Sequence, residues 1–322
     1  MKVAAYHRYG SPDVVQIEEV DKPVLKADQV LIEVRAASIN PLDYHFVRGI
    51  PYVGRLMTGL RKPRLPRLGV DVAGVVEAVG SSVTAFKPGD EVFGNCRGAL
   101  AEYACAAEAD LVAKPADMTF EQAAAIPVAA FTALQGLRDK GRVRPGQKVL
   151  INGAAGGVGT FAVQIAKWLG AHVTGVCSTR NVDLVRSLGA DRVIDYTQED
   201  FTRGPEKYDL IFDCIGNHPV RECRRVSSAG AVYMAVGAKP GRWIAPIPRM
   251  LGAALLSRFV RPRVSLVLAR RSREDLKTLC DLVREGKVTP VIDSRYRLSE
   301  TSEAIRYLLQ GHARGKVVIT ST

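Results

Sequence analysis

The stretch VLINGAAGGVGTFAVQIAKWLGAHVTGVCSTRN (residues 149–181) decides the fold. VLIN is a short apolar run typical of a buried strand, and it leads directly into a glycine-rich turn at 153–159. TFAVQIAKWLG has the spacing of an amphipathic helix and ends at Gly170, a residue favoured at helix C-termini. HVTGVCS then predicts a second strand. Strand, turn, helix and strand in this order predict the start of a doubly wound parallel sheet.

The glycine turn has the form A-x-G-x-x-G counted from Ala154, so alanine replaces the first glycine of the dinucleotide-binding fingerprint. Gly156 would let the backbone approach a pyrophosphate, and Gly159 would let the helix pack closely on the strand. The helix N-terminus adds free N–H groups and the positive end of its dipole. This context favours a dinucleotide site over a merely tight turn. The expected cofactor contacts here are Ala155, Gly156, Gly157 and Val158.

The end of the second strand carries no acid. An acid at this place bonds the ribose 2′-hydroxyl of NAD and would repel a 2′-phosphate. Ser178, Arg180 and Asn181 instead offer donors and one positive charge, which predicts NADP(H) as the cofactor. Tyr196, ending the next expected strand, could reach the same phosphate with its hydroxyl. The alternative is that Arg180 is a solvated residue opening the next helix.

The flanking sequence predicts a second kind of domain. Residues 1–120 have short alternating strands and turns, whereas strands and helices alternate in residues 121–284. The final part, from about 285 to 322, resembles the first module in style. We therefore expect an α/β protein with a barrel-like domain at 1–120, completed by about 285–322, and a Rossmann dinucleotide-binding domain at 121–284.

Composition sets limits on the class of protein. A chain of 322 residues that is 47% hydrophobic and 24% charged suits a two-domain globular protein. Its six cysteines form no C-x-x-C pair, which is typical of scattered reduced thiols. The N-terminal sequence lacks a signal-peptide apolar core, and no apolar run has bilayer-spanning length. These features predict a cytoplasmic protein.

The charge is strongly positive, at +12, and it is uneven. Residues 55–69 and 242–264 each carry five cations and no acid. Such stretches indicate an anionic partner or a membrane surface, or else a solvated basic face. No recognised RNA module is present, so no specific nucleic acid is expected.

The motif order resembles the medium-chain dehydrogenase/reductase superfamily, specifically its zinc-free quinone oxidoreductase branch. The motifs are INPLD (39–43), LGVDVAGVVEAVG (68–80), KPGDEVFG (87–94), AEYA (101–104), AAGGVGTFAVQIAKWLGAHV (154–173), LGADRVIDY (188–196) and GHARGKVVI (311–319). They run nearly end to end. The resemblance implies a GroES-like barrel, a Rossmann domain, an interdomain substrate cleft and a homodimer.

The same resemblance implies that both zinc sites are absent. Zinc alcohol dehydrogenases carry a cysteine where this chain has Asn40, and a His-Glu pair where it has Val70 and Asp71. Valine cannot ligate a metal, and an amide oxygen is a poor zinc donor. The lobe that would hold four cysteines is reduced to FGNCRGALAEY, with only Cys96.

Without a Lewis acid, a conjugated acceptor is easier to reduce than a simple carbonyl. We therefore expect NADPH-dependent hydride transfer to a quinone or an α,β-unsaturated carbonyl, with a bulky apolar acceptor as one candidate. By resemblance, Asn40 lies beside the nicotinamide and donates to the substrate carbonyl, while Tyr44 and His45 supply a proton or shape the pocket. Asp43 either orients this loop or is a structural turn residue. Further cofactor contacts implied by the resemblance are Thr132, Val236, Gly237 and Lys316.

Residues 239–263 mix apolar side chains with arginines and prolines. They predict a lid over a bulky substrate, a dimer interface or core helix, or a weak peripheral contact with anionic lipid. Two rival functions stay open. One is a zinc-free NADP-dependent alcohol dehydrogenase, and the other is a non-catalytic NADPH-responsive nucleic-acid-binding protein.

Overall fold

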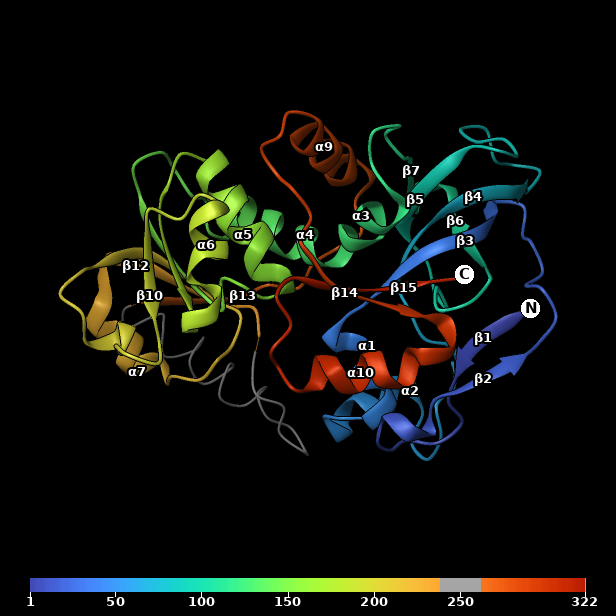
Figure 1. The fold of residues 1–322 in the computed structure, drawn as a ribbon, viewed down its shortest axis with the longest axis horizontal. Coiled ribbons are helices and arrows are strands. Elements are labelled where there is room, and N and C mark those ends of the chain that lie inside the picture. Colours follow the sequence, from blue (N-terminus) through green and yellow to red (C-terminus); the bar gives the residue numbers. More distant parts are fainter. Residues whose placement is uncertain (238–261, 322) are drawn as a thin grey trace. The chain divides into compact units, whose positions relative to one another are not determined.

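The computed structural model describes residues 1–237 and 262–321. The roles expected for residues 239–263 therefore fall almost wholly outside the described residues. The chain divides into two compact units (Figure 1). Unit 1 comprises residues 1–129, 271–284 and 290–322, and unit 2 comprises residues 130–270 and 285–289. The domain boundaries expected near residues 121 and 285 stay a prediction.

Unit 2 is built on a parallel sheet of six strands, in the order β10-β9-β8-β11-β12-β13. The strands are β8 (Lys148–Asn152), β9 (His172–Cys177), β10 (Arg192–Asp195), β11 (Tyr208–Asp213), β12 (Ser227–Ala235) and β13 (Arg263–Leu266). In chain order this is 3-2-1-4-5-6, a doubly wound sheet whose direction of winding reverses between β8 and β11. The expected Rossmann architecture is confirmed.

The helices of unit 2 connect these strands. They are α5 (Gly157–Trp168), α6 (Val182–Ser187) and α7 (Val220–Cys223), with short turns η5 (Thr179–Asn181), η6 (Phe201–Arg203) and η7 (Arg224–Val226). Two segments precede the sheet, α4 (Pro127–Leu134) and the π-helical η4 (Gln135–Lys140). Phe161, Val163 and Ile165 of α5 are fully buried, and each such side chain contributes roughly 1.5–3 kcal/mol to folding. Burial of α5 fixes the position of its N-terminus beside the glycine turn.

Unit 1 contains a seven-stranded sheet, in the order β14-β15-β3-β4-β5-β7, with β6 also paired to β3. Its strands are β3 (Gln29–Ile39), β4 (Asp71–Val79), β5 (Glu91–Asn95), β6 (Tyr103–Ala107), β7 (Leu111–Ala113), β14 (Ile292–Arg297) and β15 (Lys316–Thr320). A separate ribbon pairs β1 (Lys2–Ala5) with β2 (Gln16–Glu19). This strand-rich unit, completed by strands from the C-terminal segment, matches the barrel-like domain expected there.

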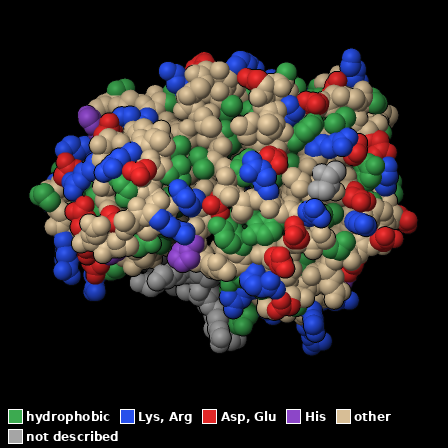
Figure 2. Space-filling model, in the orientation of Figure 1, with side chains coloured by type: hydrophobic (Ala, Val, Ile, Leu, Met, Phe, Trp, Pro, Cys, Tyr) green, Lys and Arg blue, Asp and Glu red, His purple; other side chains and the backbone are tan. Residues whose placement is uncertain are grey.

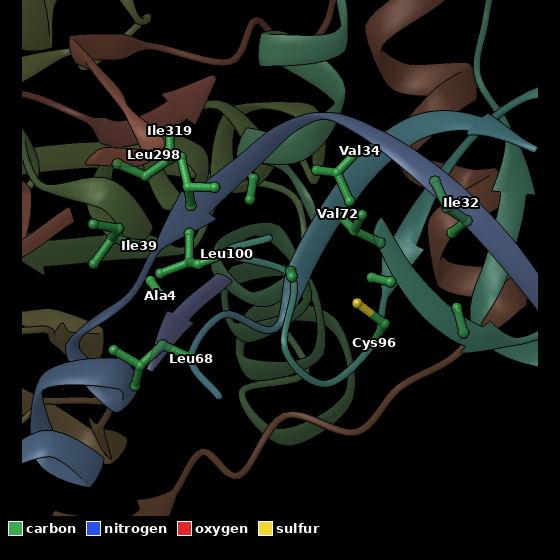
Figure 3. Close-up of a cluster of buried hydrophobic side chains, with 14 of the residues drawn as sticks. Ala4, Ile32, Val34, Ile39, Leu68, Val72, Cys96, Leu100, Leu298 and Ile319 are labelled. Carbon is green, nitrogen blue, oxygen red and sulfur yellow. The ribbon is translucent and has the colours of Figure 1, made fainter. Parts of the chain in front are cut away.

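The C-terminal strand β15 runs antiparallel to β3, so that Val317 lies opposite Ile39. Leu298 and Ile319 from the C-terminal segment consequently join Ile39 and Leu100 in one buried cluster (Figure 3). This pairing brings the start of β15 next to the end of β3, where the candidate site begins.

The helices of unit 1 lie around this sheet. They are α1 (Pro41–Arg48), α2 (Arg55–Thr58), α3 (Phe120–Ala125), α9 (Arg273–Arg284) and α10 (Thr301–Leu309), with η1 (Pro12–Val14), η2 (Tyr52–Gly54), η3 (Glu108–Asp110) and η8 (Leu298–Glu300). A capping box begins α3, where the side chains of Thr119 and Gln122 each accept a hydrogen bond from the other residue's backbone N–H group. No helix among the described residues is long and apolar enough to cross a bilayer.

Candidate functional site

The glycine turn of unit 2 has room for a phosphate group. A Cβ atom on Gly159 would lie 2.0 Å from the carbonyl oxygen of Gly153, so this position requires glycine. A Cβ on Gly156 would meet only the Gly153 oxygen, at 3.5 Å, so open space remains in front of this backbone. Gly153 itself needs the left-handed region, with φ at 84°. The turn is thus tight against the helix and open on the side where a ligand would approach.

The open side coincides with the N-terminus of α5. Gly156 is the N-cap residue, and the N–H groups of Gly157 and Val158 in the first turn have no intrahelical acceptor. Ala155 is buried in the turn that precedes them. N–H groups at a helix N-terminus, with the helix dipole behind them, bind anions. The turn therefore fits a dinucleotide pyrophosphate.

The loop after β9 carries Ser178, Arg180 and Asn181. The amide nitrogen of Asn181 donates to the Ser178 hydroxyl at 3.1 Å, while its buried side-chain oxygen has no hydrogen-bond partner among the described residues. An unsatisfied buried acceptor beside the expected ribose and phosphate position is a place where a ligand hydroxyl can donate. Arg180 is exposed in the same turn.

Asp195, a residue that sequence reasoning missed, holds this loop. Its carboxylate accepts from the Thr179 hydroxyl at 2.6 Å and from the Thr197 hydroxyl at 2.8 Å. The bond from Thr179 lowers the pKa of Asp195. The sequence feature that could have predicted this role is an aspartate at the end of the third strand, followed by Tyr196 and Thr197.

Tyr196 follows Asp195, and its backbone N–H donates to Cys177 at 3.0 Å. Its side chain is 55% exposed. Because β8, β9 and β10 are parallel neighbours, their carboxyl ends share one edge of the sheet. The structure therefore brings the glycine turn, the loop at 178–181 and Tyr196 together.

A second missed residue, Asp213, lies where the winding of the sheet reverses. It ends β11 and is fully buried. Its carboxylate accepts from the Asn152 amide at 2.8 Å, the Tyr233 hydroxyl at 2.5 Å and the backbone N–H groups of Ile215 and Gly216. Burial and this neighbouring carboxylate raise the pKa of Tyr233 well above its usual value. Asp213 thus fixes the loop that follows β11.

The remaining residues expected in unit 2 are placed as follows. Val236 and Gly237 come directly after β12, and both backbone N–H groups donate to the Asp213 carbonyl, at 3.0 and 3.1 Å. A Cβ atom on Gly237 would lie 1.9 Å from the Cys214 oxygen, so the chain packs too closely there for a side chain. Thr132 lies half-buried on α4.

Unit 1 contains a buried polar cluster around Asp71, at the start of β4. One carboxylate oxygen accepts from the Ser38 hydroxyl at 2.8 Å and the Asn40 amide at 2.9 Å. The other accepts from the Asn95 amide at 3.0 Å and the Val128 backbone N–H at 3.1 Å. A carboxylate with this many donors remains compatible with full burial.

Lys316, from the first position of β15, supplies the cation of this cluster. Its ammonium lies 2.6 Å from the side-chain oxygen of Asn40 and 3.6 Å from the Asp71 carboxylate. The side chain of Lys316 is only 3% exposed, and this burial lowers its pKa. Asn40 is therefore held from both sides, with its oxygen facing Lys316 and its nitrogen facing Asp71.

Asp43 fixes the start of α1. Its two oxygens accept from the backbone N–H groups of Asn40, at 2.8 Å, and Gly69, at 3.0 Å. Burial raises the pKa of Asp43 to about 6. The side chain therefore caps α1 and ties it to the segment that enters β4, and this contact orients the first turn.

Tyr44 and His45 follow on that turn. The Tyr44 hydroxyl accepts from the Arg48 guanidinium, and the Tyr44 and His45 rings are 5.4 Å apart. The buried Nδ1 atom of His45 has no partner among the described residues. Burial and the Arg48 charge lower the pKa of His45, so its neutral form predominates near neutral pH. The expected site residues thus divide between the two units, with Asn40, Tyr44, His45 and Lys316 in unit 1 and the others in unit 2.

The described parts of the chain hold no group of three or more His, Cys, Asp or Glu side chains arranged to bind a metal ion. At the positions where zinc alcohol dehydrogenases carry ligands, Asn40 and Asp71 instead bond to one another and to Lys316.

Two family descriptions match this chain: "Alcohol dehydrogenase GroES-like domain" over residues 26–116 and "Zinc-binding dehydrogenase" over residues 188–319. The 2-methylene-furan-3-one reductase of Solanum lycopersicum is 36% identical over 99% of this chain and 79% of its own length. The chloroplastic NADPH-dependent alkenal/one oxidoreductase of Arabidopsis thaliana has the same identity and coverage. The solved quinone oxidoreductase of Coxiella burnetii is 31% identical, covering 100% of this chain and 99% of that one, with a TM-score of 0.89.

Proposed function

Because the chain belongs to the medium-chain dehydrogenase/reductase superfamily, in its quinone oxidoreductase-like branch, we propose that it reduces quinones or α,β-unsaturated carbonyls with NADPH. One observation carries the choice of cofactor. The glycine turn, where a Cβ on Gly156 would meet only the Gly153 oxygen, shares a sheet edge with a loop after β9 that has donors and a cation but no acid.

The residues of unit 2 suit this cofactor. Gly156, Gly157 and Val158 would hold the pyrophosphate, while Ser178 and Arg180 would bind the 2′-phosphate. When bound, NADPH supplies the hydride. Thr132, Val236, Gly237, Tyr196 and Lys316 remain proposed further contacts.

The residues of unit 1 would orient the acceptor. We assign Asn40 to the acceptor carbonyl, with Asp71 and Lys316 holding its amide plane. Tyr44 and His45 border this position and supply a proton or shape the pocket. The site works without zinc, because the side chains at the former ligand positions satisfy one another.

The test is spectroscopic. NADPH and NADH oxidation are compared with a quinone and an enone as acceptors, for the wild type and for Arg180→Ala. We expect wild-type turnover to favour NADPH, and the variant to lose roughly tenfold in kcat/KM for NADPH but not for NADH. Arg203→Ala is the matched control, because Arg203 is an exposed arginine of the same unit, paired to Asp200.

Equal turnover with both cofactors would refute the assignment of Ser178 and Arg180. Alcohol oxidation with NADP⁺ at a rate matching enone reduction would favour a zinc-free alcohol dehydrogenase instead. NADPH binding without turnover of any acceptor would favour a sensing role.

A homodimer, a cytoplasmic location and a weak membrane contact through residues 239–263 complete the proposal. The cytoplasmic location is supported by six cysteines that are all free thiols. Light scattering measures the oligomeric state, and cell fractionation measures the location. A monomer at micromolar concentration would contradict the proposed homodimer. Recovery outside the cytoplasm would contradict the proposed location.

A further inference from the structure

A loop of unit 1 combines exposed aliphatic side chains with exposed cations. Residues 53–67, here the basic-apolar loop, run from η2 through α2 toward β4. Its exposed aliphatic residues are Val53, Leu56, Leu60 and Leu65, of which the three leucines are 63%, 64% and 59% exposed. Its exposed cations are Arg61, Lys62, Arg64 and Arg67. Scattered single apolar side chains are ordinary on a surface, but four exposed aliphatic side chains within one short loop need an explanation.

The charge of this region is uncompensated. No acidic residue occurs between Asp43 and Asp71 in the sequence, and both of these are fully buried. Among the described residues, no ion pair joins Arg61, Lys62 or Arg64 to a carboxylate. Some exposed cations elsewhere in unit 1 do have acidic partners, as in the pairs Lys22–Glu77 and Arg306–Asp13. Figure 2 likewise shows basic and acidic side chains interspersed over the face it displays.

The loop is held in shape from beneath. The Arg55 side chain turns inward, donating to the Gly49 carbonyl at 2.9 Å and lying 4.2 Å from the centre of the Tyr9 ring. The Tyr9 hydroxyl donates to the Gly59 carbonyl at 2.6 Å, and the Arg64 N–H donates to the Thr58 carbonyl at 2.8 Å. These contacts fix the backbone, so the apolar and basic side chains are presented together without an ordering cost on binding.

We propose that the basic-apolar loop is a docking surface for an anionic lipid bilayer. Its leucines would enter the boundary between headgroups and acyl chains, while its cations would contact anionic headgroups. The combination favours a bilayer over a nucleic acid, because phosphodiesters satisfy cations but leave aliphatic side chains in water. The loop has no aromatic residue of its own, and the neighbouring Tyr52 ring already lies against the Arg55 guanidinium, 4.7 Å from the ring centre, instead of offering a stacking surface for bases.

The basic-apolar loop does not include residues 239–263, and the proposal rests on no feature of the hydride-transfer chemistry. Docking of this loop would place the protein at a bilayer surface. Long-chain quinones and lipid-derived enones partition into bilayers, so a bilayer-docked enzyme would meet such acceptors at their source.

The experiment is co-sedimentation of the full chain with vesicles of phosphatidylcholine alone and of phosphatidylcholine containing phosphatidylserine. We expect binding only to the anionic vesicles. The charge variant R61E/K62E/R64E should lose roughly a hundredfold in partitioning. The apolar variant L56S/L60S/L65S should lose roughly tenfold or more.

The matched control is K26E/K87E/K277E, which makes the same change in net charge at three exposed lysines of the same unit. It should keep its binding to anionic vesicles. The thermal midpoint and the NADPH oxidation rate with a water-soluble acceptor are measured for every variant, and both should match the wild type.

Three results would overturn the proposal. The first is absence of wild-type binding to anionic vesicles. The second is equal loss in the charge variant and its control, or retention in the charge variant, which would assign binding to net charge or to residues 242–264. The third is full binding by the leucine variant together with equally tight binding to single-stranded DNA, which would make the loop a general polyanion surface.

Discussion

Two fully buried carboxylates, Asp71 in unit 1 and Asp213 in unit 2, are satisfied in different ways. Asp71 has a cation, Lys316, at 3.6 Å in addition to its neutral donors. The donors described at Asp213 are all neutral: one amide, one phenol and two backbone N–H groups. Asp71 belongs to an ion pair that depends on distant segments, whereas Asp213 is stabilised by hydrogen bonds close to its own strand.

This difference predicts how much stability is lost when one partner of each carboxylate is removed. Removing one partner of a buried ion pair strongly destabilises the folded state, because the other charge stays buried and uncompensated. A carboxylate with several neutral donors loses one bond at a time. Unit 1 should therefore be the more sensitive of the two to a single substitution.

The largest effect is expected for Lys316→Met. It removes the cation and leaves the Asp71 carboxylate buried without its counter-charge, so we expect a loss of about 3–5 kcal/mol in unfolding free energy. Urea denaturation measures it. The double variant Lys316→Met/Asp71→Asn should recover part of the loss, and Lys316→Arg should be milder than Lys316→Met. A loss below about 1 kcal/mol would mean that the pair is not coupled.

A pH effect of similar size is expected from Asp43. Its folded-state pKa, about 6, lies above the ordinary value of 3.8. The folded state therefore binds the proton more tightly, and this contribution is complete below pH 3.8 and is lost as the pH rises through about 6. The loss corresponds to about 3 kcal/mol. Denaturation between pH 4 and 7 should show this decline in the wild type, and Asp43→Asn should flatten it. The same slope in both proteins would contradict the assignment.

A smaller effect is expected for Tyr233→Phe. This change removes one donor from Asp213 and leaves the other three, so we expect a loss of about 1.5–3 kcal/mol in stability. Tyr208→Phe is the matched control, because the hydroxyl of this buried tyrosine contacts Thr174 and, at 3.4 Å, Glu206, but not Asp213. Equal losses of stability in the two variants would show that the hydrogen bond to Asp213 is not the cause.

The smallest effect is expected for Thr179→Val in the loop after β9. It deletes the 2.6 Å bond to Asp195 and should loosen the side chains proposed to bind the 2′-phosphate. We expect the Kd for NADPH to rise roughly fivefold, which corresponds to about 1 kcal/mol. Fluorescence titration measures this, with NADH as the control ligand. An equal change for both cofactors would place the effect away from the phosphate.

Local pattern predicted unit 2 well, because its decisive residues are close in sequence. The glycine turn, the helix that follows it and the acid-free end of β9 all lie within residues 149–181. Asp195 and Asp213 escaped notice because their role appears only once parallel strands are set side by side.

The cluster of unit 1 was less accessible to sequence reasoning. Asn40 and Lys316 are 276 positions apart, and only the antiparallel pairing of β15 with β3 brings them together. The resemblance placed Lys316 near the cofactor, which stays a prediction. Its bond to Asn40 could not be read from local spacing, since no periodicity links the two segments.

The pairing of β15 with β3 also sets an order of assembly during synthesis. Nearly all of unit 2 is contiguous, from residue 130 to residue 270, and can fold while the C-terminus is still inside the ribosome. Unit 1 must wait, with residues 36–39 of β3 lacking their β15 partner and Asp71 lacking its cation, until residues 316–320 emerge. A nascent or shortened chain ending before Lys316 would keep the nucleotide-binding fold while lacking the cation that holds Asn40 and Asp71.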